Sequence, residues 1–536
     1  MKLEGLSLIG HGTARPKGEP MHPINPATGE TLQPAYHRAD LEDVDRAAQL
    51  AWQAFRRFRL LPAAARARLL RRIAEQIEAH APEIQQRAHL ETALPLPRLQ
   101  AEMARTCHQL RLFASLIEQG WCWDARVDHP DPARQPVPKP DVRSHLIPLG
   151  PVAVFSSSNF PLAFSVAGGD TASALAAGCT VIVKAHQNHM GTSELVGRLI
   201  QQAVRECDAP EGTFSLLFGR GSEIGQALVR HPMIKAVGFT GSRKGGRALM
   251  DAAAARPEPI PLYAEMGSIN PVFLLPGALH ERAEAIATGL HGSVTLGVGQ
   301  FCTCPGLILA PAGPDTDRFL EKLSQLMANT PPGVMLTSEL CAAYHAGVEA
   351  CLKIPGVRRL TPPLAQSDPA GTRAAAALLV TTAEVFLAHE TLMEEVFGPS
   401  TLVVLCTERS QMLEIAERIE GQLTATIHAT PEELLEARDL VQALELKVGR
   451  LVFNGFPTGV EVCHAMVHGG PYPATSDGRS TSVGTRAILR FLRPVCYQNF
   501  PDAALPETLQ ENNPLGLLRI VDGRPEPGRP DNPVAG

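Results

Sequence analysis

The sequence predicts an α/β fold built on parallel sheets, and two observations carry that prediction. Between residues 151 and 255, four short apolar runs (VAVF, CTVIVKA, FSLLF and IKAVGFT) alternate with helical patterns. Such alternation is typical of βαβ units, in which a helix connects successive parallel strands. A second mixed block over residues 263–456 contains the strand-like runs NPVFLLP, CPGLILA, TLVVLC and TATIHA. At 536 residues, the chain has room for two or three domains.

Composition and charge disfavour several classes of protein. The chain is 44% apolar and 19% charged with a net charge of −6, so neither nucleic acid nor an acidic membrane surface is expected as a partner. No apolar run is long enough to predict a membrane span, and the first twenty residues do not have the pattern of a signal peptide. Eleven scattered cysteines, an odd number, favour reduced thiols and a cytoplasmic location.

Residues 40–120 have a helical pattern. Apolar residues recur at intervals of three and four after Asp40, which we expect to cap the first helix. Seven arginines fall within residues 56–72, and glutamates follow them. A nucleic-acid patch is one interpretation, but the run lacks aromatic interleaving for base stacking, so a solvated helix face is favoured. Residues 121–148 are rich in proline and predict an extended connection or arm.

The loops that follow the predicted strands are the first places to expect a ligand. In parallel α/β sheets, ligands bind at the carboxyl ends of the strands, here after Phe155, Lys184, Phe218 and Thr240. The chain contains no G-x-G-x-x-G motif; FGRGSEIG spaces its glycines one residue too far apart. FTGSRKGG occupies an equivalent strand-to-helix connection. Its backbone N–H groups and serine hydroxyl would suit a pyrophosphate.

Cys302 and Cys304 stand one residue apart in the segment TLGVGQFCTCPG. A metal pair is disfavoured because there is no second C-x-C, and His464 and His468 lack the glutamate of H-E-x-x-H, so no metal is expected. C-x-C also differs from the C-x-x-C redox motif. Two interpretations stay open, namely a pair of small buried cysteines or one reactive nucleophile.

A reactive cysteine needs a donor for the oxyanion and a base. Asn159 follows the first buried run in SSSNFP, and Glu265 stands in the otherwise apolar segment LYAEMGSINP. An isolated glutamate between strand-like runs is uncommon unless it is paired or functional. These two residues are therefore the candidates to act with a nucleophilic cysteine.

Seven motifs resemble, in order, those of the aldehyde dehydrogenase superfamily: NPATGE, SSNFP, VIVKA, FTGS, AEMGS, GQFC and EEVFGP. Each is modest alone, but seven in order over nearly the whole chain are very specific. The resemblance implies a nucleotide-binding Rossmann-type domain, a catalytic α/β domain and a β oligomerisation arm, in a homodimer or homotetramer. The implied boundaries are 1–126 and 148–262 (nucleotide-binding), 263–456 (catalytic), 127–147 and 480–505 (arm), and 506–536 (C-terminal tail).

Matched residue by residue, the resemblance implies a covalent mechanism. Cys302 takes the position of the nucleophile, Glu265 that of the general base, and Asn159 that of an oxyanion donor alongside the Cys302 N–H. The Cys302 thiolate would attack an aldehyde, and Glu265 would activate the water that hydrolyses the thioester. The surroundings are expected to lower the pKa of the Cys302 thiol. Cys304 matches no role; packing is favoured over a strained disulfide with Cys302.

The resemblance also implies where a nicotinamide cofactor would lie. Lys184 matches a ribose-binding lysine, and Gly241 with Ser242 matches the pyrophosphate contact. Glu395 and Phe397 match residues on the nicotinamide side.

The choice between NAD and NADP depends on two further positions. Gln187 stands where NAD-preferring relatives often carry a glutamate, and a neutral side chain does not repel a 2′-phosphate. Arg220 could pair with that phosphate, although an ordinary surface arginine is the alternative interpretation. We therefore predict NADP, with NAD as the alternative cofactor.

The glycine-rich C-terminal segment is similar to that of the 2-oxoglutarate semialdehyde (2,5-dioxovalerate) dehydrogenases. This implies a small aldehyde substrate and 2-oxoglutarate as the product. Fatty aldehyde dehydrogenases of luminous bacteria are the competing branch. A catalytically silent nucleotide-binding relative is the alternative of another class, disfavoured because Asn159, Glu265 and Cys302 are all present. For the substrate carboxylate, Arg479 and Ser482 are the candidate ligands.

Overall fold

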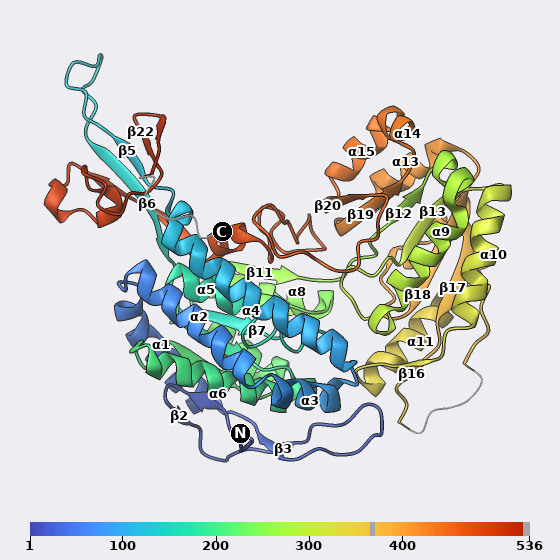
Figure 1. Ribbon diagram of the computed structural model, residues 1–536, viewed down its shortest axis with the longest axis horizontal. Coiled ribbons are helices and arrows are strands. Elements are labelled where there is room, and N and C mark those ends of the chain that lie inside the picture. Colours follow the sequence, from blue (N-terminus) through green and yellow to red (C-terminus); the bar gives the residue numbers. More distant parts are fainter. Residues whose placement is uncertain (365–369, 529–536) are drawn as a thin grey trace.

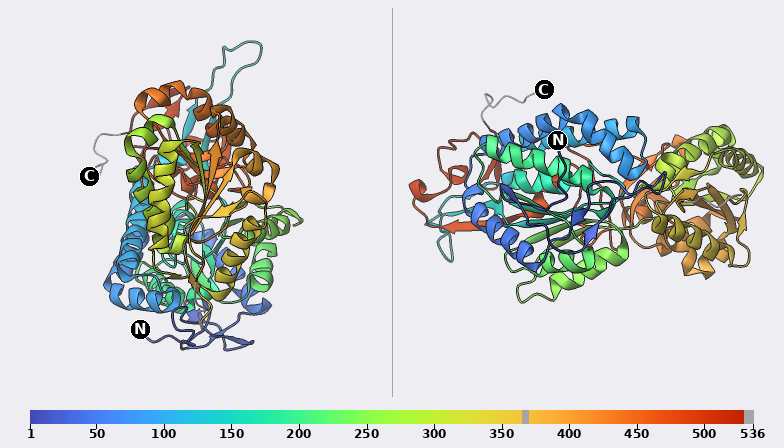
Figure 2. Two further views of the ribbon diagram at one scale, coloured as in Figure 1. Left: turned by 90° about the vertical axis from the view of Figure 1, so that its right-hand side faces the viewer. Right: turned by 90° about the horizontal axis from the view of Figure 1, so that it is seen from below.

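The computed structural model describes residues 1–364 and 370–528. Two α/β lobes lie side by side, and a β arm projects from the first lobe (Figure 1, Figure 2). After the last strand of the second lobe, the chain returns to the first lobe and then enters the arm (Figure 1). Segments far apart in the sequence therefore meet between the two sheets.

The first lobe is built on a seven-stranded sheet whose central strands are parallel, as the alternating runs predict. All residues of β7, β8 and β9 are buried, which explains why these strands appear as continuous apolar runs. In sheet order, the strands are β11 (Leu262–Glu265), β10 (Ala236–Thr240), β7 (Val152–Phe155), β8 (Val181–Lys184), β9 (Phe214–Leu217), β1 (Leu8–Ile9) and β2 (Gly12–Thr13).

Helices pack around this sheet, and the first of them begins as predicted. Asp40 caps α1 by accepting a hydrogen bond from the Asp43 N–H at 2.8 Å, and Asp43 bonds back to form a capping box. The helices are α1 (Leu41–Phe58), α2 (Ala63–Ala79), α3 (Ala81–Thr92), α4 (Leu96–Gln119), α5 (Gly169–Ala177), α6 (Met190–Glu206), α7 (Gln226–Arg230) and α8 (Arg243–Ala254).

The arginine run of residues 56–72 lies mainly on α1 and α2. Most of its members are exposed or half-buried, as expected of a solvated helix face. Arg66 is the exception, because its buried guanidinium carbon lies 5.3 Å from the ring centroid of Trp123.

The second lobe repeats the design. Its strands are, in sheet order, β15 (Arg358–Arg359), β17 (Ala377–Thr382), β18 (Ser400–Cys406), β13 (Leu307–Pro311), β12 (Val272–Leu274), β19 (Gln422–His428) and β20 (Val448–Phe453), and all but β15 run parallel. Its helices are α9 (Pro276–Thr295), α10 (Pro314–Ala328), α11 (Ser338–Leu352), α12 (Ala383–Ala388), α13 (Arg409–Arg418), α14 (Pro431–Glu436) and α15 (Arg438–Glu445). Two short antiparallel pairs join β3 (Pro20–Met21) to β4 (Tyr36–His37) and β14 (Gly333–Val334) to β16 (Arg373–Ala374).

The arm is a five-stranded sheet in the order β21 (Leu492–Gln498), β6 (Val142–Pro148), β5 (Arg126–Asp128), β22 (Arg519–Val521) and β23 (Arg524–Glu526). The prediction of a tail from residue 506 is wrong for residues 507–528. Leu509 and Leu517 are buried, and β22 pairs with β5, so this segment belongs to the arm sheet. The rest of the expected tail, residues 529–536, lies outside the described residues.

Two smaller findings concern the boundaries of the lobes and the helices. Strand β11 extends the first sheet to Glu265, slightly beyond the expected boundary at residue 262. In the described part of the chain, no helix is both long and apolar enough to cross a membrane.

Candidate active site

The parallel strands of the first sheet bring five of the predicted residues to one edge. Asn159 follows β7, Lys184 ends β8, Arg220 follows β9, Ser242 follows β10 and Glu265 ends β11. Strands that run parallel end at the same edge, so these residues meet although they are spread over a hundred positions. This edge faces the loop that carries Cys302.

The Cys302 loop has a tightly fixed backbone. After α9, residues Gly297, Val298 and Gly299 all have positive φ angles. A side chain at Gly299 would place its Cβ 2.2 Å from the carbonyl oxygen of Gly398, so only glycine allows this approach. On the other side, Asn270 Nδ2 donates hydrogen bonds to the carbonyls of both Cys302 and Cys304 at 2.9 Å. The nucleophile candidate is therefore held by its backbone from two directions.

A buried histidine links Cys302 to Glu265. His468 Nε2 lies 3.5 Å from Cys302 Sγ and 2.8 Å from Glu265 Oε1. Ser482 Oγ donates a hydrogen bond to the other carboxylate oxygen at 2.8 Å. Glu265 and His468 are 4% and 2% exposed, whereas Cys302 is half-buried. The predicted nucleophile and base are thus brought together, with His468 between them.

The same three residues bear on the question of a metal. Their ligand atoms lie within 4.8 Å of one another. The distance between His468 Nε2 and Glu265 Oε1 is that of a hydrogen bond, and it is shorter than the roughly 3.3 Å separating two nitrogen or oxygen ligands of a tetrahedral zinc ion. This geometry favours proton sharing. His464, the other histidine of the CHAMVHGG segment, is exposed.

The protonation states follow from these contacts. Burial and the neighbouring Glu265 carboxylate raise the pKa of the Cys302 thiol well above its ordinary value. This differs from the expectation of a lowered pKa, and the reasons are burial of the thiol and, after it, the anionic partner. Burial works against the charge of Glu265, but His468 and Ser482 together hold the pKa of that carboxyl below its ordinary value. In the resting site, the proton therefore resides on the thiol while the base is ionised.

Asn159 lies next to the nucleophile loop. The side-chain Nδ2 of Asn159 donates to the backbone carbonyl of Gln300 at 3.0 Å. The backbone carbonyl of Asn159 accepts a hydrogen bond from Arg98 Nη2 at 2.8 Å. One of the two N–H bonds of the amide is thereby used. The second N–H bond of the side-chain amide does not take part in the contact with Gln300 and could donate to an oxyanion. The role of Asn159 as an oxyanion donor stays a prediction.

The predicted cofactor residues differ in their surroundings. Lys184 is 7% exposed, and burial lowers its pKa to about 8. Its ammonium makes neither a hydrogen bond nor an ion pair with any residue that the structure describes. Gln187 and Arg220 are exposed. Ser242 caps α8 by accepting from the Gly245 N–H at 3.2 Å.

Gly241 is tied directly to the base, because its N–H donates to the backbone carbonyl of Glu265 at 3.1 Å. This places the FTGS loop beside the end of β11. Both the pyrophosphate candidate and the base candidate therefore lie on neighbouring strands.

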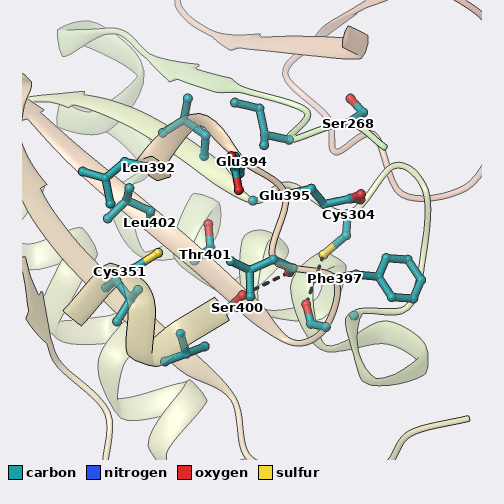
Figure 3. Close-up of a pocket in the computed structure, with 18 residues that line it drawn as sticks. Ser268, Cys304, Cys351, Leu392, Glu394, Glu395, Phe397, Ser400, Thr401 and Leu402 are labelled. Carbon is teal, nitrogen blue, oxygen red and sulfur yellow. Dashed lines mark hydrogen bonds between the residues drawn. The ribbon is translucent and has the colours of Figure 1, made fainter. Parts of the chain in front are cut away.

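Glu395 and Phe397 line a narrow pocket together with Cys304 and Ser268 (Figure 3). Cys304 is a free, buried thiol with Sγ 3.9 Å from the carbonyl of Val294, so the structure favours the packing interpretation over a bridge to Cys302, which is also a free thiol. Glu395 is exposed at the pocket rim. The pocket connects the EEVFGP segment with the back of the nucleophile loop.

The candidates for the substrate carboxylate are not supported. The side chain of Arg479 is 90% exposed and pairs with Asp477, so its assignment to the site is wrong. Ser482 does lie in the site, but its hydroxyl serves Glu265. Cations that do face Cys302 come from α4 instead: Arg98 and Arg105 line a cavity that Cys302 also lines.

Three groups of residues were missed by sequence reasoning. In the sequence, His468 stands out only as a possible metal ligand, and no motif marks Asn270. Arg98 and Arg105 lie seven positions apart, a spacing that places them on one face of a helix, which was the only signal available for them.

Comparisons with known proteins show the family to which the chain belongs. The family model described as "Aldehyde dehydrogenase family" matches residues 13–343. Alpha-ketoglutaric semialdehyde dehydrogenase 2 of Azospirillum brasilense is 53% identical over 528 residues, covering 98% of this chain and 100% of that protein. Alpha-ketoglutaric semialdehyde dehydrogenase of Acinetobacter baylyi is 47% identical over 489 residues, covering 91% and 92%.

Solved structures agree on the fold. The NADP-dependent glyceraldehyde-3-phosphate dehydrogenase of Bacillus halodurans, complexed with NADP, superposes with a TM-score of 0.79 at 22% identity, covering 93% of this chain and 99% of that one. The chain therefore belongs to the aldehyde dehydrogenase family, as its seven motifs predict.

Proposed function

We propose that this protein oxidises 2-oxoglutarate semialdehyde to 2-oxoglutarate at Cys302, with a nicotinamide cofactor as the electron acceptor. One observation carries the chemistry: the Cys302 thiol lies 3.5 Å from a histidine nitrogen that is itself 2.8 Å from the buried Glu265 carboxylate. The substrate is supported by the two relatives from A. brasilense and A. baylyi, whose names specify this semialdehyde.

The first half of the reaction uses the thiol and its neighbours. As sulfur adds to the aldehyde carbon, the thiol proton passes to the Glu265–His468 pair, because the resting site holds an ionised base beside a protonated thiol. The aldehyde oxygen becomes an alkoxide, and the donors proposed for it are Asn159 Nδ2 and the N–H of Cys302. Loss of one such donor typically costs a factor of ~10²–10³ in rate.

The second half releases the acid. When bound, the nicotinamide supplies the acceptor for the hydride, which leaves the substrate carbon as a thioester on Cys302. The proton taken from the thiol passes to solvent before hydrolysis, which leaves Glu265 ionised again. Glu265 then takes a proton from the attacking water, the carbon–sulfur bond breaks, and the acid departs. This proton returns to the departing sulfur, so that the aldehyde is oxidised by two electrons and the thiol of Cys302 and the ionised base are regenerated.

The donors at the carboxyl edge of the first sheet fit a dinucleotide. The buried Lys184 ammonium has no partner among residues 1–364 and 370–528. Ser242 stands at the N-terminus of α8, and Arg220 is exposed after β9. Ammonium, hydroxyl and helix N–H groups suit ribose and phosphate oxygens. Glu395 and Phe397, beside the nucleophile loop, would contact the nicotinamide. We propose NADP, with NAD as the alternative, because Gln187 carries no charge and Arg220 is free to pair with a 2′-phosphate.

Cofactor preference gives a direct prediction. The wild-type enzyme should show a higher kcat/KM with NADP than with NAD. R220A should lower kcat/KM for NADP by roughly 10–100-fold, because the contact with the 2′-phosphate is lost. Its kcat/KM for NAD, which has no 2′-phosphate, should stay within a few-fold of the wild-type value. Arg230, an exposed arginine at the end of the following helix α7, provides the matched control R230A. A much better kcat/KM of the wild type with NAD would contradict the proposal.

His468 gives a prediction on pH dependence. His468 helps to hold the pKa of Glu265 down, so H468Q should raise that pKa and move the acidic limb of thioester hydrolysis to higher pH. The measurement is the hydrolysis rate against pH in rapid-mixing experiments. H464Q, at the exposed histidine four residues away, is the control. An acidic limb that stays in place in H468Q would show that His468 does not set the ionisation of Glu265.

The proposed function is tested by a kinetic matrix of two cofactors against a panel of aldehydes. We expect 2-oxoglutarate semialdehyde to give the highest kcat/KM, above an unbranched medium-chain alkanal. Preference for the alkanal would overturn the substrate and favour the fatty aldehyde alternative. Absence of turnover with every aldehyde would favour a silent relative.

We also propose that the protein is cytoplasmic and self-associates as a dimer or tetramer through the arm. None of the eleven cysteines, all of which lie within the described residues, is part of a disulfide, which suits a reducing compartment. The arm sheet projects from the body and leaves β21 and β23 as its edge strands (Figure 1). Light scattering of the purified protein measures the assembly.

A further inference from the structure

A charged and aromatic cavity lies beside Cys302. It has a volume of about 240 Å³, and α4 supplies Arg98, Glu102 and Arg105 to its wall. Positions four and seven apart on a helix share one face, so α4 presents all three side chains to the same space. Three phenylalanine rings also line the cavity, namely those of Phe160, Phe164 and Phe301.

Arg105 is a cation that the described residues leave unpaired. It makes no hydrogen bond and no ion pair with residues 1–364 or 370–528, and its Nε and Nη2 are shielded from solvent with their hydrogen-bonding capacity unused. Its guanidinium carbon lies 4.9 Å from the ring centroid of Phe164. Stacking on an aromatic face holds the plane of a guanidinium while its N–H groups stay available.

Arg98 contacts the nucleophile loop through Phe301, the residue before Cys302. Its guanidinium carbon lies 4.5 Å from the ring centroid of Phe301 and 5.0 Å from that of Phe160. Its Nη2 donates to the carbonyl of Asn159, whereas its Nη1 has no partner among the described residues. Arg98 therefore has one role toward Asn159 and a second, unused hydrogen-bonding capacity.

Glu102 does not neutralise the two cations. Its Oε1 accepts the backbone N–H groups of Leu162 and Ala163 at 2.9 and 3.0 Å, which ties α4 to the loop carrying Asn159. Its Oε2 is 3.9 Å from Arg98 Nη2, too far for a hydrogen bond. The single carboxylate of Glu102 thus faces the guanidinium groups of both Arg98 and Arg105. The excess positive charge is costly in a shielded site unless an anionic ligand pairs with it.

We propose that Arg105, assisted by Arg98, binds the carboxylate of the aldehyde substrate, so that this cavity selects short oxo-acid semialdehydes. The proposal rests on the proposed function and deepens it by assigning the residues that recognise the acid end. The aldehyde carbon would lie at Cys302, the methylene groups against the three phenylalanine rings, and the carboxylate at the unpaired guanidinium. The planar guanidinium group of Arg105 can donate two parallel hydrogen bonds to a carboxylate. An alkanal has no carboxylate to accept them.

The test is R105M assayed with two substrates, 2-oxoglutarate semialdehyde and pentanal, which has the same number of carbons and no charge. We expect kcat/KM for the semialdehyde to fall about 100-fold, mainly through KM, and that for pentanal to stay within a few-fold or rise. R111M is the matched control, since Arg111 lies on the same helix but pairs with Glu78 at the surface. R105K keeps the charge without the fork and should lose at least 10-fold on the semialdehyde alone, which also covers the case in which R105M does not fold.

A second measurement separates this proposal from the proposed function. Glutarate, an unreactive five-carbon dicarboxylate, should inhibit pentanal oxidation competitively in the wild type, and its Ki should rise about 100-fold in R105M or at least 10-fold in R105K. Equal loss of both aldehydes, or no loss of either and an unchanged Ki, would overturn the role of Arg105. A wild type that prefers pentanal while glutarate inhibition depends on Arg105 would overturn the substrate and leave the anion site standing.

Discussion

C302A should abolish aldehyde oxidation, lowering kcat by about 10⁴-fold or more, while cofactor binding remains intact. The covalent route needs a sulfur that can form and break a bond to the substrate carbon, and no other side chain described near Glu265 can replace it. Turnover is followed by NADPH absorbance and cofactor binding by fluorescence titration. Binding should survive because the proposed ribose and phosphate contacts belong to the first sheet.

Cys304 provides the matched control for this experiment. It lies two residues away and is buried in an apolar cluster, and its thiol is 3.9 and 4.0 Å from two backbone carbonyls. C304A should therefore retain most of the activity, with a loss of stability of about 1–2 kcal/mol from the small cavity. Alkylation should likewise label Cys302 before Cys304, since Cys302 is the more accessible thiol. Persistent oxidation by C302A, or loss of oxidation only in C304A, would refute the assigned nucleophile.

The sheets could be predicted because their strands are buried on both faces. Runs such as those of β7, β8 and β9 are continuous apolar segments between helical patterns, and the structure places them side by side in parallel. The arm strands near the C-terminus carry no such signal. Strand β22 has three residues, and its Ile520 pairs with Arg126, which lies far away in the first quarter of the sequence. A short strand in a segment rich in proline, glycine and arginine looks like a tail until its distant partner is known.

The candidate site divides in the same way. Cys302, Glu265 and Asn159 stand in motifs that can be found by reading the chain, whereas His468 contacts Glu265 from 203 positions away and belongs to a glycine-rich segment without helical or strand periodicity. The raised pKa of Cys302 also depends on this packing, because its main causes are burial and the proximity of Glu265. The assignment of Arg479 to the substrate carboxylate was wrong for a related reason. The charge of a residue does not indicate whether its side chain points into a site or into solvent.

E265Q should slow hydrolysis of the thioester by ~10²–10⁴-fold. Formation of the thioester should then be faster than its hydrolysis. The amide has the shape of the carboxylate and can stay beside His468 and Ser482, but it cannot accept the proton of the attacking water. Rapid mixing should therefore show a burst of about one NADPH per site followed by slow turnover. Intact-protein mass spectrometry should detect the acylated enzyme, and digestion should locate the acyl group on Cys302.

Ser482 offers the comparison that isolates the carboxylate. S482A removes one hydrogen bond to Glu265 and keeps the base, so hydrolysis should slow by only about 3–10-fold, with no accumulated acyl-enzyme. If E265Q instead showed no burst and no acylated protein, Glu265 would be needed to remove the thiol proton before attack. The burst is expected because His468, whose Nε2 lies 3.5 Å from Cys302 Sγ, remains in E265Q to accept the thiol proton. Loss of the Glu265 charge also removes one of the causes that raise the pKa of Cys302. The burst amplitude therefore decides whether Glu265 acts chiefly on water or chiefly on the thiol.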